Sequence, residues 1–214
     1  MSGAYTPFGW VRLAWELALT RAFHSSARLI RRPFYLRGAR HVDFGRRITI
    51  GRGARIEAYG SGDDINIVFG DDVQLNDYVQ IASGQKVTIG NRVLIASRVF
   101  ITDHNHGTYS EGNAVMQPAR TRGGQELDGS LPSHSAPDVP PANRPLAISP
   151  VVIGDDVWLG QGVCIMPGVT IGAGSIVGAN AVVTHDIPAA CIAVGVPARV
   201  VRKHDPDSGW IANR

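Results

Sequence analysis

The chain has 214 residues, 25 of them glycine, and its 21 Lys and Arg against 18 Asp and Glu leave a net charge of +3. That length suits one domain with an attached segment, and so small a net charge argues against a nucleic-acid-binding protein. The two cysteines, Cys164 and Cys191, are too few for a disulfide framework and lie in apolar sequence, so we expect reduced, buried thiols and a cytoplasmic location.

An amphipathic helix is predicted over residues 5–30. Its apolar residues recur at spacings of three and four, at Trp10, Leu13, Leu17 and Thr20, and are flanked by Val11, Ala14, Trp15 and Ala18. Charged residues interrupt the stretch, so it is neither a signal-peptide core nor a membrane span. We expect the helix to pack on the open end of the repeats that follow. The alternative is peripheral contact with the inner face of a membrane, because arginines crowd the first quarter of the chain.

A six-residue repeat begins at about residue 41 and is most regular from Ile153 to Pro188. There the sequence reads IGDDVW, LGQGVC, IMPGVT, IGAGSI, VGANAV and VTHDIP. Position one is always Ile, Leu or Val, position five is Val, Ser, Ala or Ile, and Gly, Asn and Asp suit the tight corners. A fixed short period is typical of a solenoid, in which each repeat buries its apolar residue against its neighbours. Ile153 and Ile171 are eighteen residues apart, which predicts triangular coils of three repeats.

The repeat is interrupted over residues 103–149, which hold His, Asn, Gly and Ser and a proline-rich run. A loop of this length in a compact domain is usually functional or disordered. We therefore divide the chain into an N-terminal helical segment (1–40), a repeat domain with this loop inserted (41–202), and a polar C-terminal tail (203–214) that we expect to be loose.

Two stretches resemble a known family. The block VWLGQGVCIMPGVTIGAGSIVGANAVVTHDIPAACIAVGVPARVVR resembles the hexapeptide-repeat acyltransferases, in particular the branch with maltose, galactoside, serine and xenobiotic acetyltransferases. The stretch IGNRVLIASRVFITDHNHGTYS is similar to the subgroup that O-acetylates sugars of lipopolysaccharide and exopolysaccharide. The resemblance covers about residues 60–203. It implies an all-β, left-handed parallel β-helix, assembled as a homotrimer of three-sided prisms, with acyl-CoA in the groove between neighbouring prisms.

The resemblance places a catalytic histidine at the root of the loop, which is His104. Imidazole titrates near neutrality, so it can take the proton of an attacking hydroxyl and return it to the leaving thiolate. His106, two residues on, is the rival candidate. Asp103 either orients the imidazole or caps the turn, and Asn76 is either a polar residue of the acceptor site or an ordinary corner residue. For the oxyanion we expect a backbone N–H donor that the sequence does not locate.

By the same resemblance, the residues that contact CoA are Trp158, Gly160, Gln161, Ala179, Thr184, His185, Arg199, Arg202 and Lys203. Small residues admit the pantetheine arm, and Arg and Lys meet its phosphates. The family often has Lys where this chain has His185, which puts that phosphate contact in doubt.

The sequence thus predicts an acetyl-CoA-dependent O-acetyltransferase that acts on a sugar hydroxyl in surface-polysaccharide or lipopolysaccharide synthesis. Transfer would be direct, with no metal. One alternative is an N-acetyltransferase acting on a nucleotide-linked amino sugar or a serine-type acceptor. Remoter alternatives are a zinc enzyme like the carbonic anhydrases of this fold and a non-enzymatic structural solenoid, although the seven histidines show no obvious ligand spacing.

Overall fold

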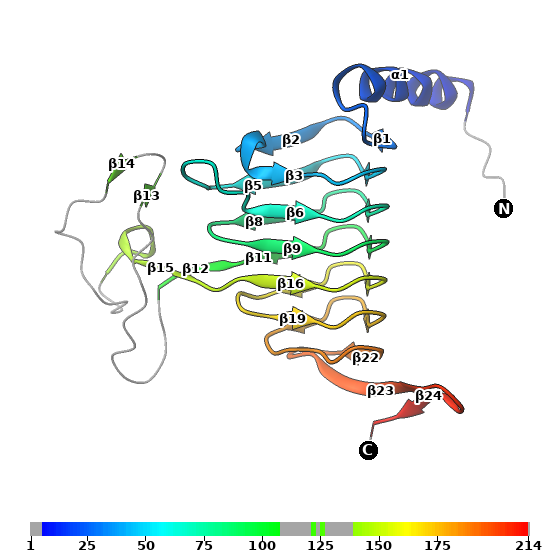
Figure 1. Ribbon diagram of the computed structural model, residues 1–214, viewed down its shortest axis with the longest axis vertical. Coiled ribbons are helices and arrows are strands. Elements are labelled where there is room, and N and C mark those ends of the chain that lie inside the picture. The colour runs from blue at the N-terminus through cyan, green and yellow to red at the C-terminus, as the bar shows by residue number, and fades with distance from the viewer. Residues whose placement is uncertain (1–5, 108–120, 123–124, 127–138, 214) are drawn as a thin grey trace.

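The computed structural model describes residues 6–107, 121–122, 125–126 and 139–213. Over these residues the chain winds into a left-handed parallel β-helix with an α-helix, α1 (Pro7–Phe23), at its N-terminal end (Figure 1). The fold class predicted from the repeats is confirmed.

Short strands stack into three flat faces. Face A consists of β1 (Leu29–Ile30), β4 (Thr49–Ile50), β7 (Gln74–Leu75), β10 (Leu94–Ile95), β17 (Trp158–Leu159), β20 (Ile176–Val177) and β22 (Cys191–Val194). Face B consists of β2 (Phe34–Arg37), β5 (Ala54–Ala58), β8 (Gln80–Ser83), β11 (Phe100–Thr102), β18 (Cys164–Ile165) and β21 (Val182–Val183). Face C consists of β3 (Val42–Asp43), β6 (Ile67–Phe69), β9 (Val87–Ile89), β16 (Val151–Ile153) and β19 (Thr170–Ile171).

The turns between faces form three edges, named here by the faces that they join. The AB edge includes residues 51–53, 76–79, 96–99, 160–163 and 178–181. The BC edge includes residues 38–41, 59–66, 84–86, 103–150, 166–169 and 184–186, and within it lie two short 3₁₀ helices, η1 (Ala39–His41) and η2 (Pro141–Asn143). The CA edge includes residues 44–48, 70–73, 90–93, 154–157 and 172–175.

The core is built from positions one and five of the repeat. Ile153 lies in register with Ile171 on face C, and Ile101 with Ile165 on face B. Their side chains, and position-five residues such as Val157, are at most 1% exposed. Burying each such side chain stabilises the fold by about 1.5–3 kcal/mol, and because every coil repeats the arrangement the apolar column is continuous. Cys191 is buried as predicted, whereas Cys164, at position six, points outward and is partly exposed.

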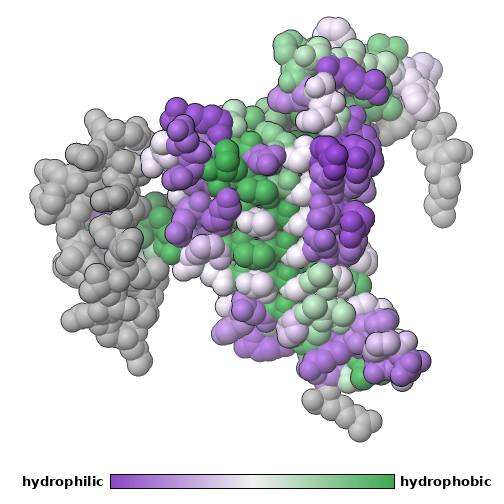
Figure 2. Space-filling model, in the orientation of Figure 1, coloured by the Kyte–Doolittle hydropathy of each residue, from purple (hydrophilic) through white to green (hydrophobic). Residues whose placement is uncertain are grey.

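The CA edge carries a ladder of charges. Its turns place a non-glycine residue at positive φ in successive coils, at Arg47, Asp72, Arg92 and Asp156. Arg47 pairs with Asp72 one coil away, and Arg92 pairs with Asp156 at 2.7 Å. Figure 2 shows the hydrophilic band that these residues form where the face C strands end. Because opposite charges alternate from coil to coil, the turns attract one another along the edge.

The N-terminal helix is shorter than the range 5–30 that the spacing predicts. Thr6 caps it by accepting a hydrogen bond from Gly9 N at 3.2 Å, and the helix ends at Phe23. The residues beyond it extend instead, with β1 pairing with β4 and β2 with β5. The first coil therefore starts near residue 29, ahead of the boundary at residue 41 expected from the sequence.

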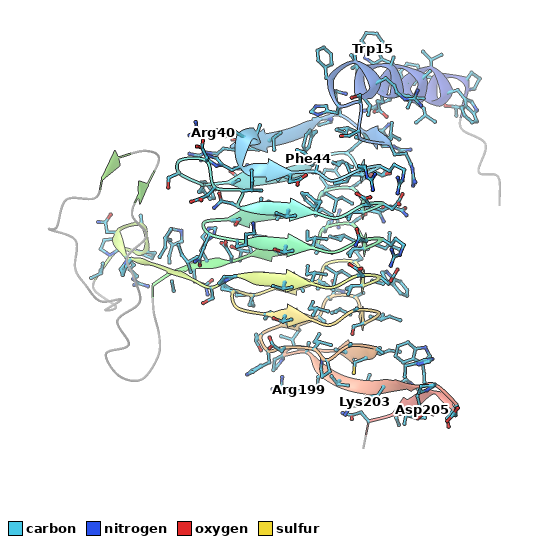
Figure 3. The ribbon with its side chains drawn as sticks, viewed as in Figure 1. Trp15, Arg40, Phe44, Arg199, Lys203 and Asp205 are labelled. Carbon is cyan, nitrogen blue, oxygen red and sulfur yellow. The ribbon has the colours of Figure 1, made fainter. Side chains whose placement is uncertain are left out.

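The helix covers the open end of the stack with its polar side. Thr20 and Glu16 are the residues of α1 that are buried, whereas Trp10, Val11 and Trp15 are exposed, and Figure 3 shows Trp15 pointing away from the coils. The expectation that the helix packs on the open end is confirmed, although Trp10 on the predicted face stays exposed. The first strand has unpaired backbone groups that a polar side chain satisfies, since Thr20 Oγ1 accepts from Ile30 N at 2.9 Å.

The C-terminal tail is also ordered, contrary to expectation. Strand β23 (Arg199–Asp205) pairs antiparallel with β22, and β24 (Gly209–Ala212) pairs antiparallel with β23. The last coil offers unpaired backbone donors and acceptors, so the tail gains hydrogen bonds by folding back on it. Among the described residues, no helix is both long and apolar enough to cross a membrane.

Candidate active site

The loop leaves the BC edge at Asp103 and returns beside it. Strand β12 (His104–His106) pairs antiparallel with β15 (Leu146–Ile148), which places His104 opposite Ile148. Ser149 N donates a hydrogen bond to the carbonyl oxygen of Asp103 at 2.8 Å. A short ribbon of β13 (Thr121–Arg122) and β14 (Gln125–Glu126) lies farther along the loop. Both ends of the loop thus converge on the candidate catalytic residues.

The Asp103 carboxylate is completely buried and fully engaged. Its Oδ1 accepts from Gly84 N at 2.7 Å and from His104 Nδ1 at 2.9 Å. Its Oδ2 accepts from Ser83 Oγ at 2.7 Å and from Gln85 N and Lys86 N at 2.8 Å each. Asp103 therefore both caps the turn 84–86 and contacts the imidazole, which are the two roles that the sequence leaves open.

The charge of Asp103 is secured by these contacts. Burial alone would raise the pKa of the carboxyl group, but the hydrogen bonds from His104, Gly84, Gln85 and Ser83 together hold it below its ordinary value. A buried carboxylate that stays ionised can only accept a hydrogen bond.

His104 is held in one orientation. Because Asp103 can only accept, Nδ1 of His104 donates to it, and Nε2 is left as the basic nitrogen. The side chain is 16% exposed, so a substrate can reach it. The ring of Tyr59 packs edge-on against the imidazole, with the ring centres 5.8 Å apart. This arrangement can accept a proton from a hydroxyl group and stabilise the resulting imidazolium.

His106 lies two residues farther along β12, opposite Leu146, and is more exposed. The five hydrogen bonds of the Asp103 carboxylate go to His104 and to the turn that begins at Ser83. This geometry favours His104 over His106 as the oriented base.

Two expected CoA residues lie on the same edge as His104. Strands β11, β18 and β21 are consecutive on face B, so Thr184 and His185 follow the strand two steps from His104, or about 10 Å toward the C-terminal end. His185 and Arg199 line a hollow of about 320 Å³, together with Asp186 and Ile187. Arg202 and Lys203 lie on β23 beside β22, and Figure 3 shows Arg199 and Lys203 at that end of the stack.

The other expected residues lie on a different edge. Gly160, Gln161 and Ala179 belong to the AB edge, and Trp158 is half-exposed on the adjoining strand of face A. A Cβ added at Gly160 would lie 2.7 Å from Ala179 N, so these turns pack tightly. Asn76 is also on the AB edge, where it lines a hollow of about 200 Å³. Within one chain, Asn76 is therefore not brought to His104.

Sequence reasoning missed three residues in contact with the Asp103–His104 pair, namely Tyr59 beside His104 and Ser83 and Gly84 bonded to Asp103. All three lie where strands of face B end, and Ala58 is in register with Ser83. An alignment by eighteen-residue coils could have found them, but insertions in the BC edge shift the spacing. Ser83 and Asp103, which are hydrogen-bonded, are 20 residues apart.

Of the seven histidines, His134 lies outside the described residues. Within the described ranges, no three His, Cys, Asp or Glu side chains gather in a way that could hold a metal ion.

Comparisons with known proteins bear on the family and the fold of this chain. The family model described as bacterial transferase hexapeptide (six repeats) matches residues 150–185. The chain is 42% identical over 200 residues, or 94% of its length and 91% of the other's, to an Escherichia coli K12 protein named putative lipopolysaccharide biosynthesis O-acetyl transferase WbbJ.

Two solved structures are similar. One is the hexapeptide-repeat acetyltransferase VCA0836 of Vibrio cholerae O1 biovar eltor complexed with acetyl coenzyme A, with 28% identity, a TM-score of 0.54, and coverage of 76% of this chain and 70% of that one. The other is a maltose O-acetyltransferase from Clostridium difficile 630, with 25% identity, a TM-score of 0.53, and coverage of 92% and 89%.

Proposed function

The chain belongs to the hexapeptide-repeat acyltransferases, and from that premise we propose that it O-acetylates a sugar hydroxyl in a lipopolysaccharide or surface-polysaccharide precursor. Acetyl-CoA is the acyl donor, as in the V. cholerae relative whose structure holds it. The observation that carries the proposal is the buried Asp103 carboxylate that orients His104 at the root of the loop.

In the proposed mechanism, Nε2 of His104 takes the proton of the sugar hydroxyl as its oxygen attacks the thioester carbonyl. The C–O bond forms, and the tetrahedral intermediate collapses with cleavage of the C–S bond. The imidazolium returns its proton to the CoA thiolate, so the acetyl ester and free CoA are the products. Asp103 stays ionised throughout, and its negative charge stabilises the imidazolium between the two proton transfers.

The donor would lie toward the C-terminal end of the stack. His185 and Arg199 line a hollow next to Thr184, and Arg202 and Lys203 on β23 add positive charge. These groups suit the phosphates of CoA, whose acetyl end would then point toward His104.

We propose that the active assembly is a homotrimer. The residues expected in one site lie on two edges of the prism, the AB edge with Gly160, Gln161 and Ala179 and the BC edge with His104. A neighbouring prism whose AB edge faced the BC edge would unite the two sets. The same arrangement would bring Asn76 of a neighbour toward the acceptor side.

We further propose that the protein works in the cytoplasm at the inner face of the membrane, with α1 in contact with lipid. Phe8, Val11 and Trp15 are 63–76% exposed and lie along one side of α1. The acidic residue of α1, Glu16, is turned inward and pairs with Arg12 at 3.2 Å. Arg21, in the last turn of α1, is exposed. Apolar and aromatic groups next to arginine suit an anionic lipid surface.

Two measurements test the reaction. Calorimetry should detect acetyl-CoA binding, one molecule per chain. The protein should then transfer labelled acetyl groups to de-O-acetylated lipopolysaccharide, and mild alkali should release the label. Absence of acetyl-CoA binding would overturn the donor assignment. Label that resists alkali would indicate an amide, and hence an N-acetyltransferase.

Sedimentation with vesicles tests the membrane contact. Vesicles of phosphatidylglycerol and phosphatidylcholine should carry down the wild type, and should carry down much less of the Trp15→Ser variant. Vesicles of phosphatidylcholine alone should bind weakly. Equal sedimentation of the two proteins with the anionic vesicles would contradict the proposal.

A further inference from the structure

A cluster of basic and aromatic side chains lies on the N-terminal side of His104. It consists of Tyr35, Arg37, Arg55, Glu57 and Tyr59, from strands β2 and β5 of face B and the turn that follows β5. On face B, Arg37 is in register with Glu57, and Glu57 is in register with Ala82. Ala82 is in turn in register with Thr102, which precedes the loop, so the cluster and the root of the loop lie in one column of this face.

Ring contacts connect this cluster to the catalytic base. Tyr59 packs edge-on against His104, with the ring centres 5.8 Å apart, and the guanidinium carbon of Arg37 lies 4.9 Å from the centre of the Tyr59 ring. The guanidinium is therefore no farther from the imidazole than the sum of these two distances. A hexose can reach across any separation up to that limit, with a hydroxyl hydrogen-bonded to the imidazole and a phosphate on its anomeric carbon hydrogen-bonded to the guanidinium.

The two arginines of the cluster differ in charge balance. Arg55 donates to both oxygens of Glu57, at 2.6 and 2.9 Å, and the Glu57 side chain is buried. The charge of Arg55 is thus neutralised. Arg37, by contrast, is exposed and forms no ion pair with any residue that the structure describes, including Asp63 and Asp64 of the next turn. Its guanidinium is held by the Tyr59 ring but remains available to an anion.

The expected donor residues lie on the opposite side of His104. Thr184, His185 and Arg199 are toward the C-terminal end, whereas Arg37 is on β2, three strands from β11 toward the N-terminal end. A phosphate bound at Arg37 would therefore belong to the acceptor rather than to CoA.

We infer that Arg37, positioned by Tyr59, binds the phosphate of a glycosyl phosphate whose hydroxyl faces His104. This inference rests on the proposed O-acetyltransferase function and deepens it by naming the acceptor class. The phosphate chemistry is shared by nucleoside diphosphate sugars and by sugars linked to a lipid diphosphate. A planar guanidinium forms paired hydrogen bonds with phosphate oxygens, which explains the use of Arg at this position.

The test is calorimetry on protein that is first saturated with CoA, so that the donor phosphate sites are occupied. Glucose 1-phosphate is the probe, and glucose is its uncharged counterpart. We expect the wild type to bind glucose 1-phosphate, Arg37→Ala to weaken binding roughly tenfold, and Arg37→Lys to restore part of it. Arg92→Ala, which removes an exposed arginine on the CA edge, is the matched control and should leave the affinity unchanged.

Three results would overturn the inference. They are absence of glucose 1-phosphate binding to the wild type, equal affinity for glucose, and unchanged affinity in Arg37→Ala. The protein is titrated with CoA before glucose 1-phosphate is added, and this first titration tests the proposed function separately. A protein that did not bind CoA would contradict the acyltransferase function, whereas the three results above contradict only the role of Arg37. UDP-glucose and citronellyl diphosphate-linked glucose then distinguish the two sources of the phosphate, since the natural class should bind more tightly than glucose 1-phosphate.

Discussion

The CA and BC edges of the same prism are built from the same kind of corner but have opposite characters. On the CA edge the turns repeat their backbone conformation, and exposed arginines and aspartates pair from coil to coil. On the BC edge the turns differ in length, and the central carboxylate, Asp103, is buried and bonded to one histidine and one turn. The repeated, ion-paired turns of the CA edge thus stabilise the stack, whereas the irregular turns of the BC edge form the candidate active site.

Among substitutions on the two edges, His104→Ala on the BC edge should cause the largest loss of activity. We expect kcat to fall on the order of 10²–10⁴-fold, because the variant lacks the general base, while CoA affinity remains unchanged. Thermal stability should fall modestly, because the buried Asp103 carboxylate loses one of its five hydrogen bonds. Steady-state kinetics and calorimetry measure the three quantities. His106→Ala is the control and should retain most activity. If His106→Ala alone abolished turnover, the assignment of the base would be wrong.

Asp103→Asn should reduce both activity and stability. The amide offers a single acceptor oxygen where the carboxylate accepts five hydrogen bonds, so at least one buried donor loses its partner. We expect the free energy of unfolding to fall by about 1–3 kcal/mol, and kcat to fall less than in His104→Ala. Urea unfolding and kinetics give the two values. A variant with wild-type stability would show that the cap contributes nothing.

The same substitution should alter the acid dependence of stability. The folded-state pKa of Asp103 is lowered from its ordinary value of 3.8, so in the window below that value the unfolded chain binds a proton that the folded chain does not. The stability from this group is present above the window and is lost as pH falls through the folded-state pKa. Unfolding free energies measured across this range should therefore decline less steeply in Asp103→Asn. Parallel curves would contradict the assigned shift.

Arg202→Ala probes the end of the stack where the donor is proposed to bind. Its guanidinium donates to the Trp210 carbonyl at 3.3 Å and is otherwise exposed on β23. We expect the KM for acetyl-CoA to rise about tenfold with little change in kcat, because a contact equal in ground and transition states is removed. An unchanged KM would place the phosphates of CoA elsewhere.

The smallest effect is expected on the CA edge itself. Arg92→Ala removes one exposed ion pair with Asp156, which should lower thermal stability only slightly and leave kcat and KM unchanged. Thermal unfolding at low and high salt measures it, and the difference between variant and wild type should shrink as salt screens the pair. A loss of activity would mean that the two edges are coupled.

Much of the fold follows from the sequence, because the apolar residues at positions one and five of each repeat have one way to stack. The root of the loop was located for the same reason, since His104 lies two residues beyond Thr102, where the regular repeats end. The packing of the helix on the open end is confirmed, but its length and the order of the C-terminal tail were mispredicted. The residues after Phe23 pair as β1 with β4, and the tail adds a hairpin through β23, because unpaired strand groups at the two ends of the stack gain hydrogen bonds in this way. Tyr59 and Ser83 were missed because insertions change the spacing of the BC turns.

The hydrogen bond between Ser149 N and the Asp103 carbonyl has an evolutionary consequence. It closes the coil where the loop departs, and β11 and β16 pair with their neighbours as if no residues had been inserted between them. Insertions and deletions within the loop can therefore accumulate without shifting the register of any coil. A lineage can exchange the segment inserted beside His104 while the scaffold and the base are inherited intact.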